Sequence, residues 1–304
     1  MKRKVGLSIG GLQFRYGEEK AIEMVAESGA DGFDFDTSGS RWDYKREDFW
    51  YALSDEELFE KVTALRKKAE SLGLEIFQTH GRIKGFRGDA EEDANILENA
   101  RRDLIVAKAL GAPVCVMHGV ATGRVGKDAD PQWVRDLNFD MFNKILVYAK
   151  QYDVKVATET FGDALGGEVC DFFGNCHEFI PSFDRIAAEG DNAKYFTVCM
   201  DTGHTNKAMR FGDNPTPGEF IRRLGSRLGI LHLNDNNGMT DQHDIPFTGT
   251  VDWTDVLNAL DEVGYCGPYN MELNLMTFGK PMAQDMMNFS VKVMRNMLRE
   301  HYGE

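Results

Sequence analysis

The stretch LGILHLND at residues 228–235 is an apolar run that ends in polar residues, and the same pattern recurs along the chain. It appears again in FTVCMD at residues 196–201. Nearly continuous apolar runs of this length are typical of parallel strands that helices cover on both faces. We therefore predict parallel strands at these positions, each with polar residues at its carboxyl end.

Apolar runs of this kind alternate with amphipathic helical segments. The segment after Ser54 shows the helix signals: Ser54 and Glu57 have the spacing of a capping box, and Gly73 stands where a left-handed residue ends the helix. The apolar runs begin about 38 residues apart on average, which fits one strand and one helix per repeat. They begin near Val5, Asp31, Leu74, Ala112, Val154, Tyr195, Leu228 and Pro268.

Eight such units predict an α/β fold, a single closed (β/α)8 TIM barrel that spans residues 1–304 as one domain. A doubly wound open sheet is the alternative. It calls for a glycine-rich phosphate turn after the first strand, and Gly10-Gly11-Leu12-Gln13 does not form one. In the last helix, the stripe Met282, Met286, Phe289, Val293 and Met297 is expected to pack in the core or against another subunit.

Composition limits the function classes. The 304 residues carry 35 Lys and Arg against 49 Asp and Glu, a formal net charge of −14, which argues against nucleic acid as the main partner. The sequence has no run of about 20 apolar residues, so no membrane span is expected. The five cysteines are too sparse for a disulfide scaffold, which favours a cytoplasmic location.

Most of the chain's histidines follow predicted strands. Five of the seven do so, and in a TIM barrel the carboxyl ends of the strands form the active site. Carboxylates that meet on this narrow ring repel one another unless a cation lies among them. The sequence therefore predicts a divalent metal there. The polar residues at the predicted strand ends are Asp34, Asp36, His80, His118, Glu159, Asp201, His204, His232, Asp235, Asp241, His243 and Glu272.

Several of these residues lie in motifs of a known family. The motifs are DTGH at 201–204, HLND at 232–235, the run from Asp241 to Trp253, and GYCGP at 264–268 before Glu272. Together they resemble the xylose isomerase-like TIM-barrel superfamily, in particular its sugar and sugar-phosphate isomerase and epimerase branch. The resemblance covers the whole barrel in order. It departs at residues 246–249, where PFTG replaces the Pro-Gly-Glu-Gly common in sugar-processing relatives.

The resemblance implies one divalent metal ion held by Glu159, Asp201, His232 and Glu272. Mn²⁺ is the first expectation, with Mg²⁺, Co²⁺ or Zn²⁺ as alternatives. It also implies a metal-dependent isomerase or epimerase acting on a small-molecule sugar or sugar derivative, with His204 facing the substrate. We expect further substrate contacts from the other polar residues at the strand ends, and a homo-oligomer is expected. These further residues are His80, His118, Asp235, Asp241 and His243.

A metal that chelates a carbonyl and the adjacent hydroxyl steadies the enediolate formed when the neighbouring C–H loses its proton. Glu159 and Glu272 are the candidate catalytic residues, because each can reach one face of the substrate carbon. Which of them is the base and which the acid stays open.

Three alternatives remain. Apurinic endonucleases of the same superfamily bind three zinc ions, and the residues at their nine ligand positions are matched here. Gly81-Arg82 and Gly119-Val120 depart from the pattern of that branch, and the negative charge disfavours DNA. A polyol or keto-sugar dehydratase would share the first proton transfer and then expel a hydroxyl. A non-catalytic sugar-binding barrel would keep the metal without moving substrate protons.

Two loop features have open interpretations. Basic residues after the third and fourth strands either attract a phosphorylated or carboxylated sugar or pair with nearby acids; they are Arg82, Lys84, Arg87, Arg124 and Lys127. The segment 163–182 is long for a strand-to-helix connection and is either a lid, a subunit contact or a surface insertion. Cys170, Cys176 and His177 in it could form a metal clip, but offer only three candidate ligands.

Overall fold

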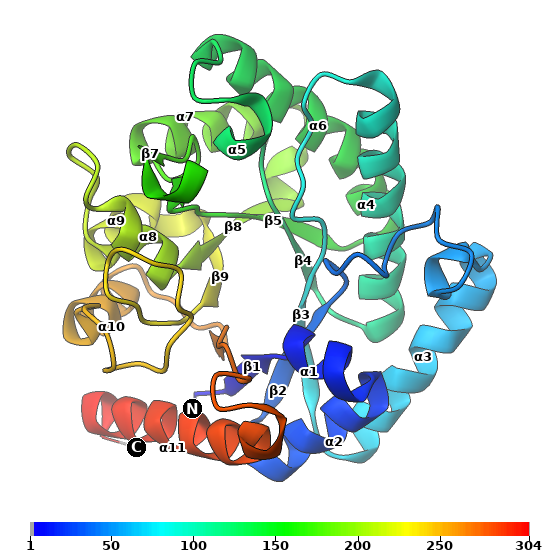
Figure 1. Ribbon diagram of the computed structural model, residues 1–304, viewed down its shortest axis with the longest axis vertical. Helices are drawn as coiled ribbons and strands as arrows, with labels where there is room; N and C mark the ends of the chain where they lie inside the picture. The colour runs from blue at the N-terminus through cyan, green and yellow to red at the C-terminus, as the bar shows by residue number, and fades with distance from the viewer. Residues whose placement is uncertain (1–2, 304) are drawn as a thin grey trace.

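The computed structural model describes residues 3–303, and in these residues eight parallel strands form a barrel that helices surround (Figure 1). The strands are hydrogen-bonded in the order β10-β1-β2-β3-β4-β5-β8-β9. This is the predicted (β/α)8 TIM barrel. The strand bounds are β1 Val5–Ser8, β2 Gly32–Asp36, β3 Glu75–His80, β4 Val114–Met117, β5 Lys155–Glu159, β8 Phe196–Asp201, β9 Leu228–His232 and β10 Tyr269–Met271. The predicted domain, 1–304, extends over residues 1–2 and 304, which lie outside the described range.

The barrel closes between β9 and β10 through few backbone contacts. Just beyond β9, Leu233 forms an isolated bridge with Met271. The Leu233 N–H donates to the Asn270 carbonyl, and the Glu272 N–H donates to the Leu233 carbonyl. The other neighbouring strands have ladders of two to five residue pairs. The β9–β10 junction is therefore a seam, and the candidate site residues His232 and Glu272 lie on its two sides.

The helices around the barrel begin and end where the sequence signals predict. Ser54 caps α3, with both hydrogen bonds of the capping box to Glu57, and Gly73 has a φ of +75°. The helices are α1 Gly10–Tyr16, α2 Glu18–Ser28, α3 Asp55–Ser71, α4 Ala90–Leu110, α5 Thr122–Val125, α6 Pro131–Tyr152, α7 Cys176–Ala187, α8 Thr202–Ala208, α9 Pro217–Leu224, α10 Trp253–Glu262 and α11 Ala283–Tyr302. Short 3₁₀ turns lie at Trp50–Ala52, Leu165–Gly167, Asn192–Lys194, Gly225–Arg227 and Lys280–Met282.

An apolar layer fills the middle of the barrel. It contains Val114, Val116, Ala157, Cys199 and Ile230, all buried and in contact as one cluster. In a strand, successive side chains point to opposite faces, so the inward residues two positions further along β5, β8 and β9 are Glu159, Asp201 and His232. The chain thus places the polar groups one layer above an apolar floor, at the carboxyl ends of the strands.

The α11 stripe predicted to pack in the core or against another subunit lies largely outside the core, and its packing against another subunit stays a prediction. Met282 and Phe289 are exposed, and Met286 and Val293 are half-buried; Met297 alone of the five is buried. The helix buries a different set, namely Ala283, Met287, Ser290, Val291, Met294, Met297 and Leu298. Both faces are apolar, so helical periodicity could not distinguish them.

The long segment after β5 folds against the barrel. It begins with a two-stranded hairpin, β6 Asp163–Ala164 and β7 Val169–Cys170, and continues into α7. The Asp171 carboxylate accepts hydrogen bonds from the N–H groups of Thr122 and Phe173, which ties the segment to the loop after β4. Phe173 is buried in the core. The surface-insertion interpretation is therefore wrong for this part of the segment.

The metal clip proposed in the same segment does not form. Cys170 accepts a hydrogen bond from Asn214, and His177 faces Asp213; among residues 3–303, neither belongs to a group that could hold an ion. No helix in the described part of the chain has the length and apolarity that a membrane crossing needs.

Candidate metal centre

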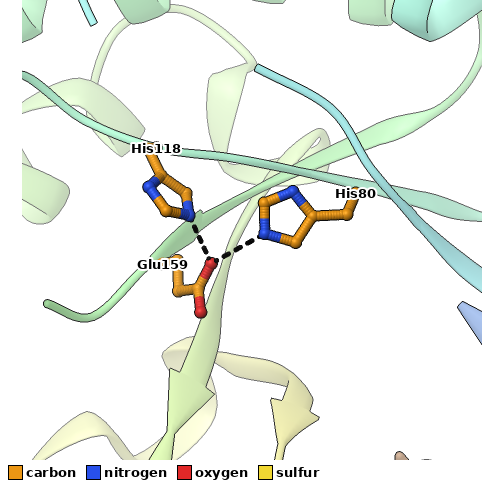
Figure 2. Close-up of side chains that lie close together, drawn as sticks. All are labelled: His80, His118 and Glu159. Carbon is orange, nitrogen blue, oxygen red and sulfur yellow. Dashed lines mark hydrogen bonds and ion pairs between the residues drawn. The ribbon is translucent and has the colours of Figure 1, made fainter. Parts of the chain in front are cut away.

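The polar side chains at the carboxyl ends of the strands are here called the rim. Glu159, at the end of β5, lies among them. Its Oε2 atom is 2.7 Å from Nε2 of His118 and 3.3 Å from Nε2 of His80 (Figure 2). Its Oε1 atom is 2.9 Å from Nδ1 of His232. Glu159 is fully buried, so the two oxygens of one carboxylate face imidazoles from three other strand ends.

The four predicted metal ligands meet in one place. Each of Glu159, Asp201, His232 and Glu272 offers a ligand atom, and these atoms all lie within 4.8 Å of one another. The Nδ1 atom of His232 is 3.3 Å from Oε2 of Glu272 across the seam. Two of the three carboxylates are fully buried. Buried carboxylates at this separation repel strongly, and a divalent cation among them is the simplest compensation.

The chain fixes Asp201 through the DTGH motif. Asp201 is the N-cap of α8 and accepts a hydrogen bond from the His204 N–H at 2.6 Å, while its other oxygen accepts one from Asn234 Nδ2 at 2.7 Å. This contact requires glycine at position 203, because a Cβ there would lie 1.9 Å from Oδ1 of Asn234. The close approach of the ends of β8 and β9 therefore explains the glycine of the DTGH motif.

A second group of polar residues lies beside this cluster. Oδ2 of Asp241 is 3.4 Å from Nε2 of His204 and 3.3 Å from Nε2 of His243. Backbone carbonyls of Thr160 and Glu272 lie 3.0 Å from the Nδ1 atoms of these two histidines. A carbonyl accepts only, so each Nδ1 carries a proton, and each Nε2, which faces Asp241, is the atom that would bind a cation once its own proton is displaced. His204, Asp241 and His243 thus form a further candidate ligand group, as do His80, His118 and Glu159.

Burial and charge shift the pKa values of these groups in opposite directions. Burial lowers the pKa of His118, whereas in His80 the carboxylates of Glu159 and Glu272 outweigh burial and raise the pKa to about 10. His243 likewise has its pKa raised to about 9, because Asp241 and Glu272 outweigh its burial. Burial raises the pKa of Glu272. The rim therefore holds protons in the absence of a cation, and a bound cation would compete with them.

A pocket of about 300 Å³, here called the mouth pocket, leads to these ligand groups from the carboxyl side of the barrel. Its polar lining includes Ser8, Asp36, Asp241, His243 and Glu272, and its walls include Leu12, Leu273, Leu275 and Met276. Among the described residues that line it, none is a lysine or an arginine. The pocket can take a small polar molecule and offers carboxylate and imidazole groups for its hydroxyls.

Asp235 is the predicted substrate contact that the structure does not support. Its carboxylate is fully buried and accepts three hydrogen bonds from the loop after β9 and one from the first residue of α10, which saturate it. The donors are the N–H groups of Asn236, Phe247 and Val251 and the indole N–H of Trp253. Asp235 therefore anchors the 236–252 loop. The sequence placed it correctly at a strand end but could not show where its side chain points.

The basic loop residues are mostly paired with acids. Arg82 binds Asp103, Arg87 and Arg124 both bind Glu92, and Lys127 lies 3.9 Å from Glu168. These contacts favour the ion-pair interpretation over an anion site, although the partners differ from the acids nearest in sequence.

Two buried charged residues beside the site have no role assigned from the sequence: Asp34, which the sequence places at a strand end, and Lys207, which it does not indicate at all. Asp34 contacts His232 from below, and Lys207 contacts Asp241 from the side. Asp34 lies two residues before Asp36 on β2, so strand alternation puts both on the inner face, which is a usable signal. Lys207 follows His204 by one helical turn, but a lysine on a short helix carries no comparable signal.

Comparison with known proteins agrees with this architecture. The model of the family described as xylose isomerase-like TIM barrel matches residues 22–295. The chain belongs to this family. A solved D-tagatose 3-epimerase-like protein superposes with a TM-score of 0.74 at 20% identity, covering 99% of this chain and 98% of that one. The IolI protein with a bound zinc atom superposes with a TM-score of 0.75 at 15% identity, covering 99% and 100%. At these identities, the superpositions establish the fold of this xylose isomerase-like barrel.

Curated relatives of this xylose isomerase-like chain match over shorter stretches. D-psicose 3-epimerase of Enterocloster bolteae is 28% identical over 123 residues, which is 40% of this chain and 34% of that protein. The chain spans about half or less of the length of the curated relatives it matches.

Proposed function

We propose that this chain is a divalent-metal-dependent sugar isomerase or epimerase that moves a proton at the carbon next to a carbonyl. The observation that carries the proposal is the meeting of Glu159, Asp201, His232 and Glu272 around one point. Three carboxylates and one imidazole suit Mn²⁺, Mg²⁺ or Co²⁺, and Zn²⁺ is compatible. The proteins named as 3-epimerases among its relatives support a sugar as the substrate.

When bound, a divalent cation would supply Lewis-acid polarisation of the sugar carbonyl and would offset negative charge on the substrate. The residues of the chain would hold the sugar and move the proton. Asp36 and His243 line the mouth pocket and can bind hydroxyls. The aromatic ring of Phe161 packs edge-on against His118 at 4.7 Å between centroids and helps to keep water from this side of the site.

Glu272 is the better placed of the two candidate catalytic glutamates. Its side chain is 21% exposed and lines the mouth pocket, whereas Glu159 is fully buried with both oxygens facing histidines. Burial raises the pKa of Glu272, which makes its carboxylate a stronger base for accepting a proton. We assign proton transfer on the open face to Glu272, and give Glu159 the position on the opposite face.

The test combines metal analysis with NMR of a panel of free ketoses in D₂O. The proposal predicts loss of activity on chelation, recovery with Mn²⁺ or Co²⁺, and deuterium at the carbon next to the carbonyl. Conversion to a new keto-sugar with loss of water would favour the dehydratase, and bound sugar without deuterium entry would favour the binding protein. The homo-oligomer and the cytoplasmic location stay predictions.

A second candidate is a three-metal phosphodiesterase resembling the apurinic endonucleases. The observation that favours it is the presence of three candidate ligand groups, two of which share Glu159. In the third group, backbone carbonyls orient the rings of His204 and His243. Against it stand the net charge of −14 and a mouth pocket whose described lining has no lysine or arginine. Three zinc ions per chain together with cleavage of an abasic-site duplex would decide for this candidate.

A further inference from the structure

The side of His232 that faces away from the ligand cluster is held by a buried carboxylate. Its Nε2 atom lies 2.9 Å from Oδ2 of Asp34, while its Nδ1 atom faces Glu159 and Glu272. His232 and Asp34 are both fully buried inside the barrel. Both ring nitrogens thus face a carboxylate oxygen at 2.9 Å, and the Gln78 side-chain amide lies 3.0 Å from Nε2. Because an ionised carboxylate only accepts hydrogen bonds, the Asp34 contact holds a proton on Nε2, and Nδ1 is the atom that would bind a cation in place of its own proton.

Burying the Asp34 carboxylate at this position carries a free-energy cost. Its Oδ2 also accepts hydrogen bonds from Ser8 Oγ at 3.1 Å and Gln78 Nε2 at 3.2 Å, but Oδ1 has no partner among the described residues. None of these donors is a lysine or arginine. A buried carboxylate with one unsatisfied oxygen destabilises a fold unless it interacts with a cationic group. The available group is the imidazole of His232, and through it a cation bound at Nδ1.

Three of the other rim histidines have a backbone carbonyl as the nearest partner of Nδ1, namely His80, His204 and His243. In His204 and His243, a carboxylate oxygen of Glu159 or Glu272 lies 3.6 Å from the same atom. A carbonyl orients a ring but carries no charge. Asp34 both orients its ring and makes the imidazole more basic, as outer carboxylates do for metal-binding histidines.

We propose that Asp34 is a positioning residue that sets the tautomer and the donor strength of His232 and so tunes the affinity of the site for its cation. The inference rests on the proposed function for the identity of the site. It assigns to Asp34 no contact with the substrate, because His232 stands between Asp34 and the ligand cluster.

The experiment compares Asp34→Asn, Asp34→Leu and a matched control, Ser8→Ala, which removes one hydrogen bond to Asp34 and leaves the contact to His232. Zn²⁺ affinity is measured by competition with a chromophoric chelator. We expect about 10-fold weaker binding for Asp34→Asn, which keeps an acceptor but loses the charge, and about 100-fold for Asp34→Leu. Ser8→Ala should stay within about 3-fold of wild type.

Two further readouts separate positioning from general damage. In the Zn²⁺-loaded wild type, the ¹⁵N spectrum should show an Nε2–H proton on His232 that exchanges slowly, and Asp34→Leu should lose it. Thermal melting of the metal-free proteins shows whether each variant folds. If Asp34→Leu does not fold, the comparison rests on Asp34→Asn.

Each outcome of the Zn²⁺ and ¹⁵N measurements either supports or overturns the role of Asp34. Weaker Zn²⁺ binding with a changed His232 signal supports the inference even if the wild type converts no ketose, in which case only the proposed reaction fails. Wild-type Zn²⁺ affinity and an unchanged signal in folded variants would overturn the inference even if the ketose activity is found. Failure of the wild type to bind Zn²⁺ would also overturn it.

Discussion

The ammonium group of Lys207 lies 3.2 Å from Oδ1 of Asp241 and at the same distance from Oδ1 of Asp163, and its side chain is 6% exposed. Lys207 thus joins the hairpin after β5 to the loop after β9, beside the candidate site. Lys207→Met should lower the free energy of unfolding by about 2 kcal/mol, because two carboxylates lose their nearly buried partner.

Urea unfolding measures this change. Lys144→Met is the control, since Lys144 pairs with Asp140 on the exposed surface of α6 and should change stability by less than about 0.5 kcal/mol. Equal small effects in both variants would show that the Lys207 pairs contribute little.

The two glutamates should respond differently to removal of their charge. Glu272→Gln should lower kcat by about 10²- to 10⁴-fold while the protein still binds a cation, because the variant removes a proton-transfer group and one of four ligands. Glu159→Gln should weaken cation binding more strongly, since Glu159 faces both His118 and His232. Activity assays and metal titrations on the same preparations test this.

Glu262→Gln provides the control, because Glu262 pairs with Arg222 on the outer surface. Near-normal turnover of Glu272→Gln would remove Glu272 from the proton-transfer step.

His204 offers a check on the number of ligand groups. As a substrate contact, His204→Asn should raise KM about 10-fold with little loss of metal. As a ligand with Asp241 and His243, it should lower the metal content by one ion per chain. Elemental analysis of purified wild type and variant distinguishes the two, and a change in neither quantity would exclude both roles.

The buried Asp171 predicts a pH dependence of stability. Burial raises its pKa from 3.8 to about 6. The folded state therefore binds the proton more tightly than the unfolded state, so the stability that this group contributes is present below about pH 4 and is lost as the pH rises through 6. The loss is about 3 kcal/mol at most.

Asp171→Asn lacks this titration, so the difference in free energy of unfolding between wild type and variant should fall from pH 4 to pH 7. Urea titrations at four pH values measure it. A difference that stays constant across this range would contradict the assignment.

The barrel and its rim could be predicted because they depend on local patterns. Apolar runs such as 228–233 and caps such as Ser54 are encoded by neighbouring residues, and the strand ends then bring Glu159 and His232 together. The direction of a side chain beyond a strand end depends on contacts that are distant in sequence. Asp235 turned toward its own loop for this reason.

The core alternative for the α11 stripe is wrong for a different reason. Phe289 and Met287 belong to opposite faces of a helix that is apolar on both, and only packing against the barrel determines which face is buried. Asp34 was visible as a strand residue, but its importance depends on the orientation of the His232 ring.

The seam between β9 and β10 has a consequence for folding. His232 and Glu272 approach to 3.3 Å across the junction that has the fewest paired residues in the described barrel. A cation bound by both side chains would hold the ends of β9 and β10 together. Chelation should then raise amide hydrogen exchange at Leu233 and Glu272 well before it does so on β4 and β5. If chelation leaves exchange unchanged at Leu233, at Glu272 and on β4 and β5, the barrel stays closed without the cation.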